Sequence, residues 1–229
     1  MPHTYEFPRP ALTVDAAVFG LDEGELKVLL IERGLKPFKG QWALPGGFVQ
    51  EGEDLDRAVE RELEEEAGLS GVYLEQLHTF GAVRRDPRER VVSVAWFALV
   101  NLADHIVRAA TDAADARWFS AAAPPPLAFD HGEILTLALD RLRGKLRWQP
   151  VGFELLPEKF TLTQLQHLYE TVLGETVDKR NFRKKVLGLD LLVPLAETRS
   201  AGRQRPAQLF RFDPARYTWL RQRGFHFEL

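Results

Sequence analysis

The sequence predicts an α/β chain with two domains, a larger α/β/α sandwich followed by a smaller helical domain that ends in a hairpin. The first half alternates strand-like apolar runs with amphipathic helices, and the second half holds two capped helices and two short strands. Charge divides the chain similarly: residues 1–149 hold 17 Lys and Arg against 24 Asp and Glu, a net −7, and residues 150–229 hold 13 against 9, a net +4. This asymmetry favours two domains with different partners. We place them at residues 1–147 and 154–229.

The composition is that of a globular chain and excludes several classes of protein. The 229 residues are 45% hydrophobic and 28% charged, which is atypical of disordered chains. There is no cysteine, which excludes disulfides and thiolate metal sites and is consistent with a reducing cytoplasm. The start at Met1–Glu6 has no signal-peptide pattern, and no apolar run is long enough to span a membrane. We therefore expect a cytoplasmic protein with no membrane partner.

Two strands and a glycine-rich segment open the first domain. Apolar, β-branched runs predict strands at residues 12–19 and 26–31, joined by a turn at residues 21–24. Residues 42–48 predict a short strand that runs into a Gly-Gly turn. Paired glycines would let the backbone come close to a ligand.

A strongly acidic helix is predicted next, from Asp54 to Ala67. Its buried side would carry Leu55, Val59 and Leu63, and Gly68 stands where a helix ends. Five carboxylates lie in residues 60–66, and three of them share one helical face, namely Glu62, Glu65 and Glu66. Like charges at this spacing weaken a helix by roughly 0.2–0.5 kcal/mol per pair. A bound divalent cation would reverse that effect, and oxygen ligands of this kind suit Mg²⁺ or Mn²⁺. The alternative is a solvated acidic face.

The rest of the first domain continues the same alternation. We expect a strand pair at residues 72–82 and 91–100, a short strand at residues 116–119, and a helix from Asp130 to Leu142. Glu133 follows Asp130 at the spacing of a capping box. His131 is interpreted as a hydrogen-bonding or surface residue. Trp42 and Trp118 are interpreted as core residues, although an aromatic ring near a site could stack on a nucleobase.

The second domain has the order helix, turn, helix, hairpin, which is the winged helix-turn-helix pattern. Thr161 would cap a helix over residues 162–173, and Asp178 would cap a second helix that continues to Leu187. Strands follow at residues 191–195 and 208–212, around a loop at residues 196–207.

Both the second helix and the loop are basic, which favours binding to duplex DNA. Residues 179–211 hold 9 basic and 2 acidic residues. Lys and Arg supply salt-dependent contacts to phosphates, while Arg and Asn can read base edges. The expected DNA contacts are Lys179, Arg180, Asn181, Arg183, Lys184, Lys185, Arg203 and Arg205, with Arg199 nearby in the loop. A solvated basic face and a protein-docking module are the alternatives.

The acidic helix and the glycines before it resemble the Nudix box, G-x5-E-x7-R-E-U-x-E-E-x-G-U with U an aliphatic residue. All nine fixed positions are present, at Gly47, Glu53, Arg61, Glu62, Leu63, Glu65, Glu66, Gly68 and Leu69. The resemblance implies a mixed-sheet sandwich that hydrolyses a nucleoside diphosphate linked to another group. It implies that Glu62, Glu65, Glu66 and the Gly47 carbonyl hold Mg²⁺ or Mn²⁺, and that Glu53 orients Arg61. The general base would lie on a later loop, with Asp112, Asp115 and Glu89 as open candidates.

Other segments resemble the Nudix-related transcriptional regulators, the NrtR-like family. They are residues 128–131, 153–157, 160–162 and 179–185. The resemblance implies a homodimeric repressor whose Nudix domain senses ADP-ribose or a related nucleotide and whose winged helices hold operator DNA near genes of NAD metabolism. Many such regulators have an incomplete box, whereas this box is whole, which favours hydrolysis of the ligand. The alternative is a stand-alone Nudix hydrolase whose C-terminal module serves only dimerisation or docking.

Overall fold

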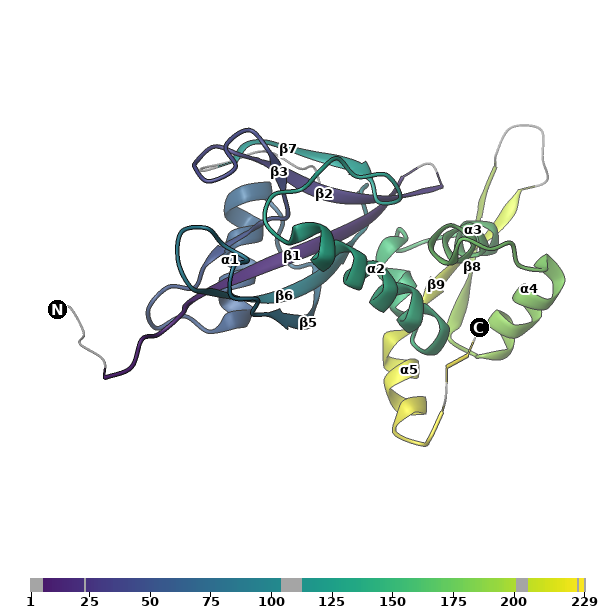
Figure 1. Ribbon diagram of the computed structural model, residues 1–229. Coiled ribbons are helices and arrows are strands. Elements are labelled where there is room, and N and C mark those ends of the chain that lie inside the picture. The colour runs from purple at the N-terminus through teal and green to yellow at the C-terminus, as the bar shows by residue number, and fades with distance from the viewer. Residues whose placement is uncertain (1–5, 23, 104–112, 201–205, 226, 229) are drawn as a thin grey trace. The chain divides into compact units, whose positions relative to one another are not determined.

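The computed structural model describes most of the chain, which forms two compact units (Figure 1). The first unit comprises residues 1–20, 27–99 and 105–139, and the second comprises residues 21–26, 100–104 and 140–229. The described residues are 6–22, 24–103, 113–200, 206–225 and 227–228.

A seven-stranded mixed sheet forms the centre of the first unit. Its strand order is β3-β2-β1-β6-β5, with β4 paired to β1 and β7 paired to β2. The strands are β1 (Ala11–Asp22), β2 (Glu25–Arg33), β3 (Trp42–Ala43), β4 (Gly46–Phe48), β5 (Tyr73–Phe80), β6 (Val91–Val100) and β7 (Ala113–Ser120). The predicted α/β sandwich is confirmed.

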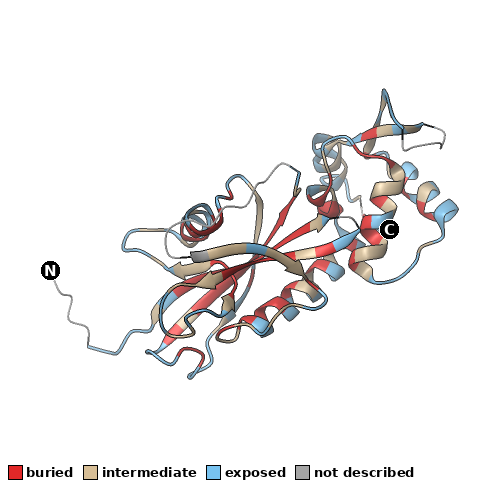
Figure 2. Ribbon diagram, turned by 90° about the horizontal axis from the view of Figure 1, so that it is seen from above, coloured by how far each residue is buried: buried red, intermediate tan, exposed pale blue. Residues whose placement is uncertain are grey.

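The central strands β1 and β6 are buried along almost their whole length. Every residue from Thr13 to Gly20 is buried, and so is every residue from Ser93 to Val100. Two helices, α1 (Leu55–Ala67) and the first turns of α2 (His131–Trp148), lie on opposite faces of the sheet (Figures 1 and 2). Strands covered on both faces carry continuous apolar runs, as these two do.

The expected strands are found, but several are longer than expected because pairing continues past the apolar run. The first strand reaches Asp22, the second reaches Arg33, and the strand expected at residues 116–119 begins at Ala113. The Gly-Gly turn is wrong. Gly46 and Gly47 belong to β4, which pairs antiparallel with β1.

Close approach, rather than a turn, explains the two glycines. A Cβ atom on Gly46 would lie 2.2 Å from the carbonyl oxygen of Val14, and one on Gly47 would lie 2.3 Å from Oε1 of Glu62. Neither position has room for a side chain, because β4 runs directly against β1 at Gly46 and against the acidic helix at Gly47.

The helix that carries the box has the boundaries expected from its sequence. Asp54 precedes the first turn, and Gly68 ends the helix in the left-handed conformation at φ 69°. The next helix, α2, continues six residues past the expected end at Leu142. Leu146 lies one helical turn after Leu142 and is also buried, so the buried side of the helix continues.

The second unit contains the expected helix, turn, helix and hairpin. Thr161 and Gln164 form a capping box before α3 (Leu162–Leu173), and Asp178 caps α4 (Lys179–Gly188). The hairpin pairs β8 (Leu192–Arg199) with β9 (Ala207–Phe212), so β8 extends into the expected loop.

Two helical segments of the second unit were not expected. They are a 3₁₀ helix at Pro150–Leu155 and α5 at Pro214–Arg221, whose first position holds the proline that helix starts favour. In the described part of the chain, no helix has the length and apolar character needed to cross a membrane.

Candidate functional site

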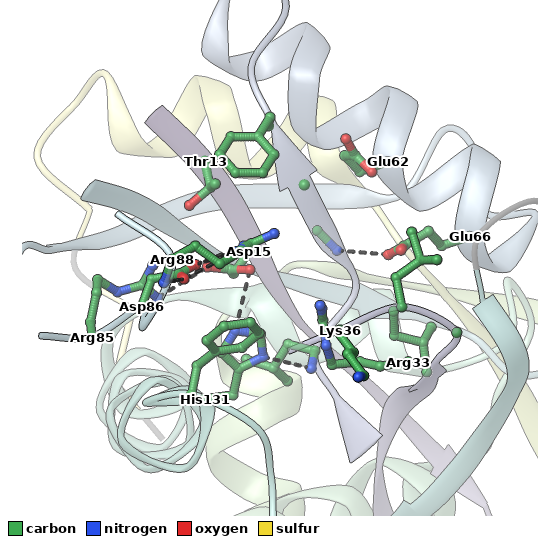
Figure 3. A pocket seen from close by; sticks show the side chains of 18 residues that line it. Thr13, Asp15, Arg33, Lys36, Glu62, Glu66, Arg85, Asp86, Arg88 and His131 are labelled. Atoms are coloured by element: carbon green, nitrogen blue, oxygen red, sulfur yellow. Dashed lines mark hydrogen bonds and ion pairs between the residues drawn. The ribbon is translucent and has the colours of Figure 1, made fainter. Parts of the chain in front are cut away.

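A charged cavity of about 270 Å³ lies in the first unit (Figure 3). Strands β1 and β4, the end of β2, helix α1, the loop after β5 and the start of α2 contribute to its lining. Its ionisable residues are four basic, four acidic and one imidazole, namely Arg33, Lys36, Arg85, Arg88, Asp15, Glu62, Glu66, Asp86 and His131. A cavity with so many charges is suited to an anionic ligand or a cation rather than to an apolar molecule.

Glu62 and Glu66 form the acidic wall of this cavity. They lie one helical turn apart in α1 and are 9% and 7% exposed. Oε2 of Glu66 accepts the N–H of Gly46 at 2.8 Å. Burial raises the pKa of Glu66 to about 8, and burial also raises the pKa of Glu62 even though Arg61 donates to it. Two adjacent carboxylates that resist ionisation are a favourable place for a cation.

Arg61 connects the acidic helix to the segment before it. Its Nε and Nη2 donate to the two carboxylate oxygens of Glu53 at 2.8 and 3.0 Å, and Nη2 also donates to the carbonyl of Phe48. This hydrogen bonding holds the pKa of Glu53 below its usual value. The expected Glu53–Arg61 pair is therefore present, and it holds β4 against α1.

Glu65 lies apart from the two buried carboxylates. Its side chain is 46% exposed, it contacts Nη1 of Arg61 at 3.1 Å, and it does not line the cavity. The helical spacing predicted that the three glutamates share one face. Instead, Glu62 and Glu66 are buried against the sheet, and Glu65 is exposed to solvent.

The residues present fit a divalent cation in their chemistry. Glu62 and Glu66 offer oxygen ligands, and the missing side chain of Gly47 leaves space directly beside the carboxylate of Glu62. Among the described residues, however, no three acidic or imidazole side chains converge on one point. Glu62 and Glu66 are thus the two carboxylates that this wall brings to the cavity.

The opposite wall is built on a buried ion pair. In Figure 3, Arg85, Asp86 and Arg88 lie on one side of β1, and Glu62 and Glu66 lie on the other. Arg85 donates to both carboxylate oxygens of Asp130, at 2.9 and 2.6 Å. Its Nη2 also lies 3.4 Å from Asp15, which accepts the hydroxyl of Ser93 as well. The loop after β5 is therefore fixed to the start of α2.

His131 belongs to this buried network, not to the surface. Its Nδ1 accepts the N–H of Leu44 at 2.9 Å, and its Nε2 lies 3.5 Å from Asp15. Because Nδ1 accepts, a neutral ring carries its proton on Nε2, facing the carboxylate. Burial lowers the pKa of His131, which favours this neutral form. His131 therefore positions Asp15 and is not an available base.

Two arginines at the cavity lie against aromatic rings. The guanidinium of Arg88 is held by both oxygens of Asp86 and lies 5.1 Å from the ring centre of Phe48 and 5.8 Å from that of Phe129. Arg33 lies 4.7 Å from the centre of the Phe129 ring and donates to the carbonyl of Pro37. Burial lowers the pKa of Arg33, and the nearby charge of Arg88 lowers it further.

Two of the three candidate general bases, Glu89 and Asp115, do not line this cavity. Glu89 is exposed and lies outside the cavity lining, and Asp115 on β7 pairs with Arg117. Asp112 lies outside the described residues. The carboxylates that sequence reasoning missed are Asp15 and Asp86. The signal for Asp15 was a charged residue inside an apolar strand, where an unpaired charge would be costly.

Trp42 and Trp118 are half-buried and do not line the cavity. The ring of Trp42 packs edge-on against Phe119 of β7, with the ring centres 4.6 Å apart. The aromatic residues at the cavity are Phe48 and Phe129 instead.

The basic helix α4 presents a largely exposed charged face in the second unit. Phe182 and Val186 are its buried residues, and its exposed polar ones are Lys179, Arg180, Asn181, Lys184 and Lys185. Asp178 accepts the N–H of Asn181 at 2.8 Å and so fixes the start of the helix. This face of α4 is therefore both exposed and positively charged.

Arg183 differs from its neighbours because it is half-buried. Its Nη2 donates to the hydroxyl of Thr163 in α3 at 3.1 Å, so it joins the two helices. Arg199 is exposed at the end of β8, and Arg203 and Arg205 lie outside the described residues.

The raised pKa of Glu66 gives a stability prediction. The folded protein binds this proton more tightly than the unfolded chain, so the stabilisation is complete below about pH 4.5 and is lost as the pH rises through about 8. Glu66→Gln removes this loss. In EDTA we expect the variant to gain stability over the wild type between pH 5 and 8, by up to roughly 4 kcal/mol at 1.36 kcal/mol per pKa unit.

Urea unfolding of both proteins at pH 5 and pH 8 measures this difference. Glu64→Gln is the matched control, because Glu64 lies on the same helix and is exposed. A gain for Glu66→Gln that is the same at both pH values would contradict the burial of an ionisable carboxylate at this position.

Comparisons with known proteins match both halves of the chain. The family model of the NUDIX domain matches residues 11–138, and that of the NrtR DNA-binding winged helix domain matches residues 152–212. The chain is 38% identical over 211 residues to an ADPR responsive transcriptional repressor, NtrR, of Acinetobacter baylyi, covering 90% of this chain and 84% of that protein.

Two further relatives represent an enzyme and a DNA complex. The chain is 40% identical over 140 residues to an ADP-ribose pyrophosphatase of Methanocaldococcus jannaschii, covering 61% of this chain and 75% of that protein. It is similar to the crystal structure of Shewanella oneidensis NrtR complexed with a 27mer DNA, at a TM-score of 0.81 and 35% identity, covering 94% of this chain and 97% of that one.

Proposed function

The chain belongs to the NrtR family of Nudix-domain transcriptional regulators, and on that premise we propose that it is a repressor controlled by ADP-ribose. Its Nudix domain would bind and hydrolyse ADP-ribose with Mg²⁺ or Mn²⁺, and its winged helix would bind operator DNA. The observation that carries the proposal is the charge of the cavity, together with a basic helix in the same chain.

The charges at the cavity favour a diphosphate only when a cation is present. Four basic and four acidic side chains line it, and His131 is neutral, so their charges sum to zero when all four carboxylates are ionised, as cation binding requires of Glu62 and Glu66. One divalent cation brings the sum to +2, which offsets the two negative charges of a diphosphate bridge. We therefore expect nucleotide binding to depend on the metal.

The roles of the box residues follow from their places. Glu62, Glu66 and the Gly47 carbonyl would hold the cation, and Glu65 is proposed as a further ligand. When bound, the cation supplies charge neutralisation at the phosphate oxygens and a more acidic water. Arg61 of α1 donates to Glu53 and to the carbonyl of Phe48, and these bonds hold β4 against α1. The carboxylates that line the cavity are the ones placed to accept the proton of an attacking water.

For the second unit we propose a DNA contact through α4 and the hairpin. Lys179, Arg180, Lys184 and Lys185 would contact phosphates, and Asn181 would read a base edge in the major groove. Arg203 and Arg205 of the wing remain proposed contacts. Helix-turn-helix repressors bind two half-sites of an operator as two-fold symmetric dimers, so we propose that this chain forms a homodimer. We further propose that it acts in the bacterial cytoplasm and that its targets are genes of NAD metabolism.

Binding of the protein to its own promoter region tests the proposal. Fluorescence anisotropy should show binding that weakens with salt and that ADP-ribose relieves. In Mg²⁺, the protein should release AMP and ribose 5-phosphate from ADP-ribose. Promoter binding without any response to ADP-ribose would remove the regulatory part, and hydrolysis without promoter binding would favour a stand-alone hydrolase.

A further inference from the structure

We propose that the corner of the cavity formed by Thr13, Phe48 and Arg88 holds the nucleobase of the ligand and that the Thr13 hydroxyl reads the edge of that base. This inference rests on the proposed function, because it assigns one part of a nucleotide ligand to one part of the same cavity. It makes Thr13 a specificity-determining residue, distinct from the carboxylates at the metal-binding wall.

Thr13 carries a hydroxyl that the protein leaves unused. The residue lines the cavity and is 7% exposed, and its Oγ1 has no hydrogen-bond partner among the described residues. A buried polar group without a partner costs about 1–3 kcal/mol. A ligand that accepts from this hydroxyl, or donates to it, would recover that cost.

The pairing of β1 with β4 places Thr13 beside an aromatic ring. Thr13 is directly opposite Phe48, so their side chains share one face of the sheet. The next pair on that face is Asp15 and Gly46, where β4 contacts Glu66 of the acidic wall. The corner is therefore one step along the strands from the place proposed for the cation and the diphosphate.

The contents of this corner favour a flat ring with polar edges. Phe48 is 41% exposed although it lines the cavity, so its ring is available for stacking. The guanidinium of Arg88, itself flat and polar, lies near the rings of both Phe48 and Phe129. Stacking of a base on an aromatic side chain contributes about 1–3 kcal/mol.

A phosphate would gain less from this corner than a base. The charge of Arg88 is already offset by Asp86, which accepts two short bonds from it, and an aromatic ring does not attract an anion. Arg33, by contrast, bonds a carbonyl and makes no carboxylate hydrogen bond within the described residues. We therefore expect Arg33 and the cation, rather than Arg88, to bind the phosphates.

Calorimetric titration with two ligands tests the assignment. The first is the α,β-methylene analogue of ADP-ribose, which resists hydrolysis, and the second is the same compound without its base, both in Mg²⁺ buffer. We expect Thr13→Val to weaken binding of the first roughly 5- to 20-fold, the loss of about one hydrogen bond. Binding of the base-free compound should be unchanged. Thr13→Ser keeps the hydroxyl and should bind within about 2-fold of the wild type.

Thr79→Val is the matched control, because Thr79 is exposed on β5 and does not line the cavity. If Thr13→Val binds the analogue as tightly as the wild type does, the inference is overturned and the proposed function stands. Equal loss for both compounds would also overturn it, because the hydroxyl would then serve the diphosphate or the fold. No binding of either compound to the wild type would remove the proposed function and the inference with it.

Discussion

Glu66→Gln is expected to lower the rate of ADP-ribose hydrolysis at saturating Mg²⁺ by at least about 100-fold. The side chain keeps its size and can still accept the N–H of Gly46, so the local geometry should survive. The amide carries no charge, however, and cannot balance a divalent cation beside Glu62. Release of AMP, followed by chromatography at several Mg²⁺ concentrations, measures the loss.

Glu64→Gln provides the comparison for this experiment, because Glu64 is exposed on the same helix and does not line the cavity. It should retain most of the activity. If Glu66→Gln hydrolyses ADP-ribose as fast as Glu64→Gln does, the proposed cation site is in the wrong place. Urea unfolding of both variants in the Mg²⁺ buffer of the assay separates a loss of activity from a loss of folded protein.

The boundaries of the box helix could be predicted because local chemistry decides them. Asp54 and Gly68 frame α1 at the expected positions, and Thr161 and Asp178 cap the two helices of the second unit. Caps depend on residues within a few positions of each other, and a sequence displays those directly.

The cavity wall that lies opposite the box helix could not be predicted in the same way. Asp15, Arg85 and Asp130 meet from three distant parts of the chain, and their spacing contains no period that links them. The sequence likewise could not separate Glu65 from Glu62 and Glu66, because helical spacing gives a shared face but not which part of that face the sheet covers. Burial by β4 makes that distinction, and it depends on Gly46 and Gly47.

The double variant Lys184→Ala, Lys185→Ala is expected to weaken binding to the promoter region by about 10- to 100-fold at low salt. Both side chains are exposed on α4, and neither contributes to its buried side. If each lysine contacts one phosphate, the slope of log affinity against log salt should fall by about 2. Fluorescence anisotropy across a series of salt concentrations gives both quantities.

Lys145→Ala is the control for this pair, because Lys145 is a half-buried lysine on α2 whose Nζ donates to Gln149, away from α4 in the sequence. It should leave affinity and slope unchanged. Arg183→Ala should also weaken binding, but its bond to Thr163 means that it would disturb the contact of α4 with α3 as well. The exposed lysines therefore separate DNA contact from helix packing. A slope in the lysine variant equal to that of the wild type would mean that α4 does not face the phosphates, and the helix would then be a docking surface or a solvated face.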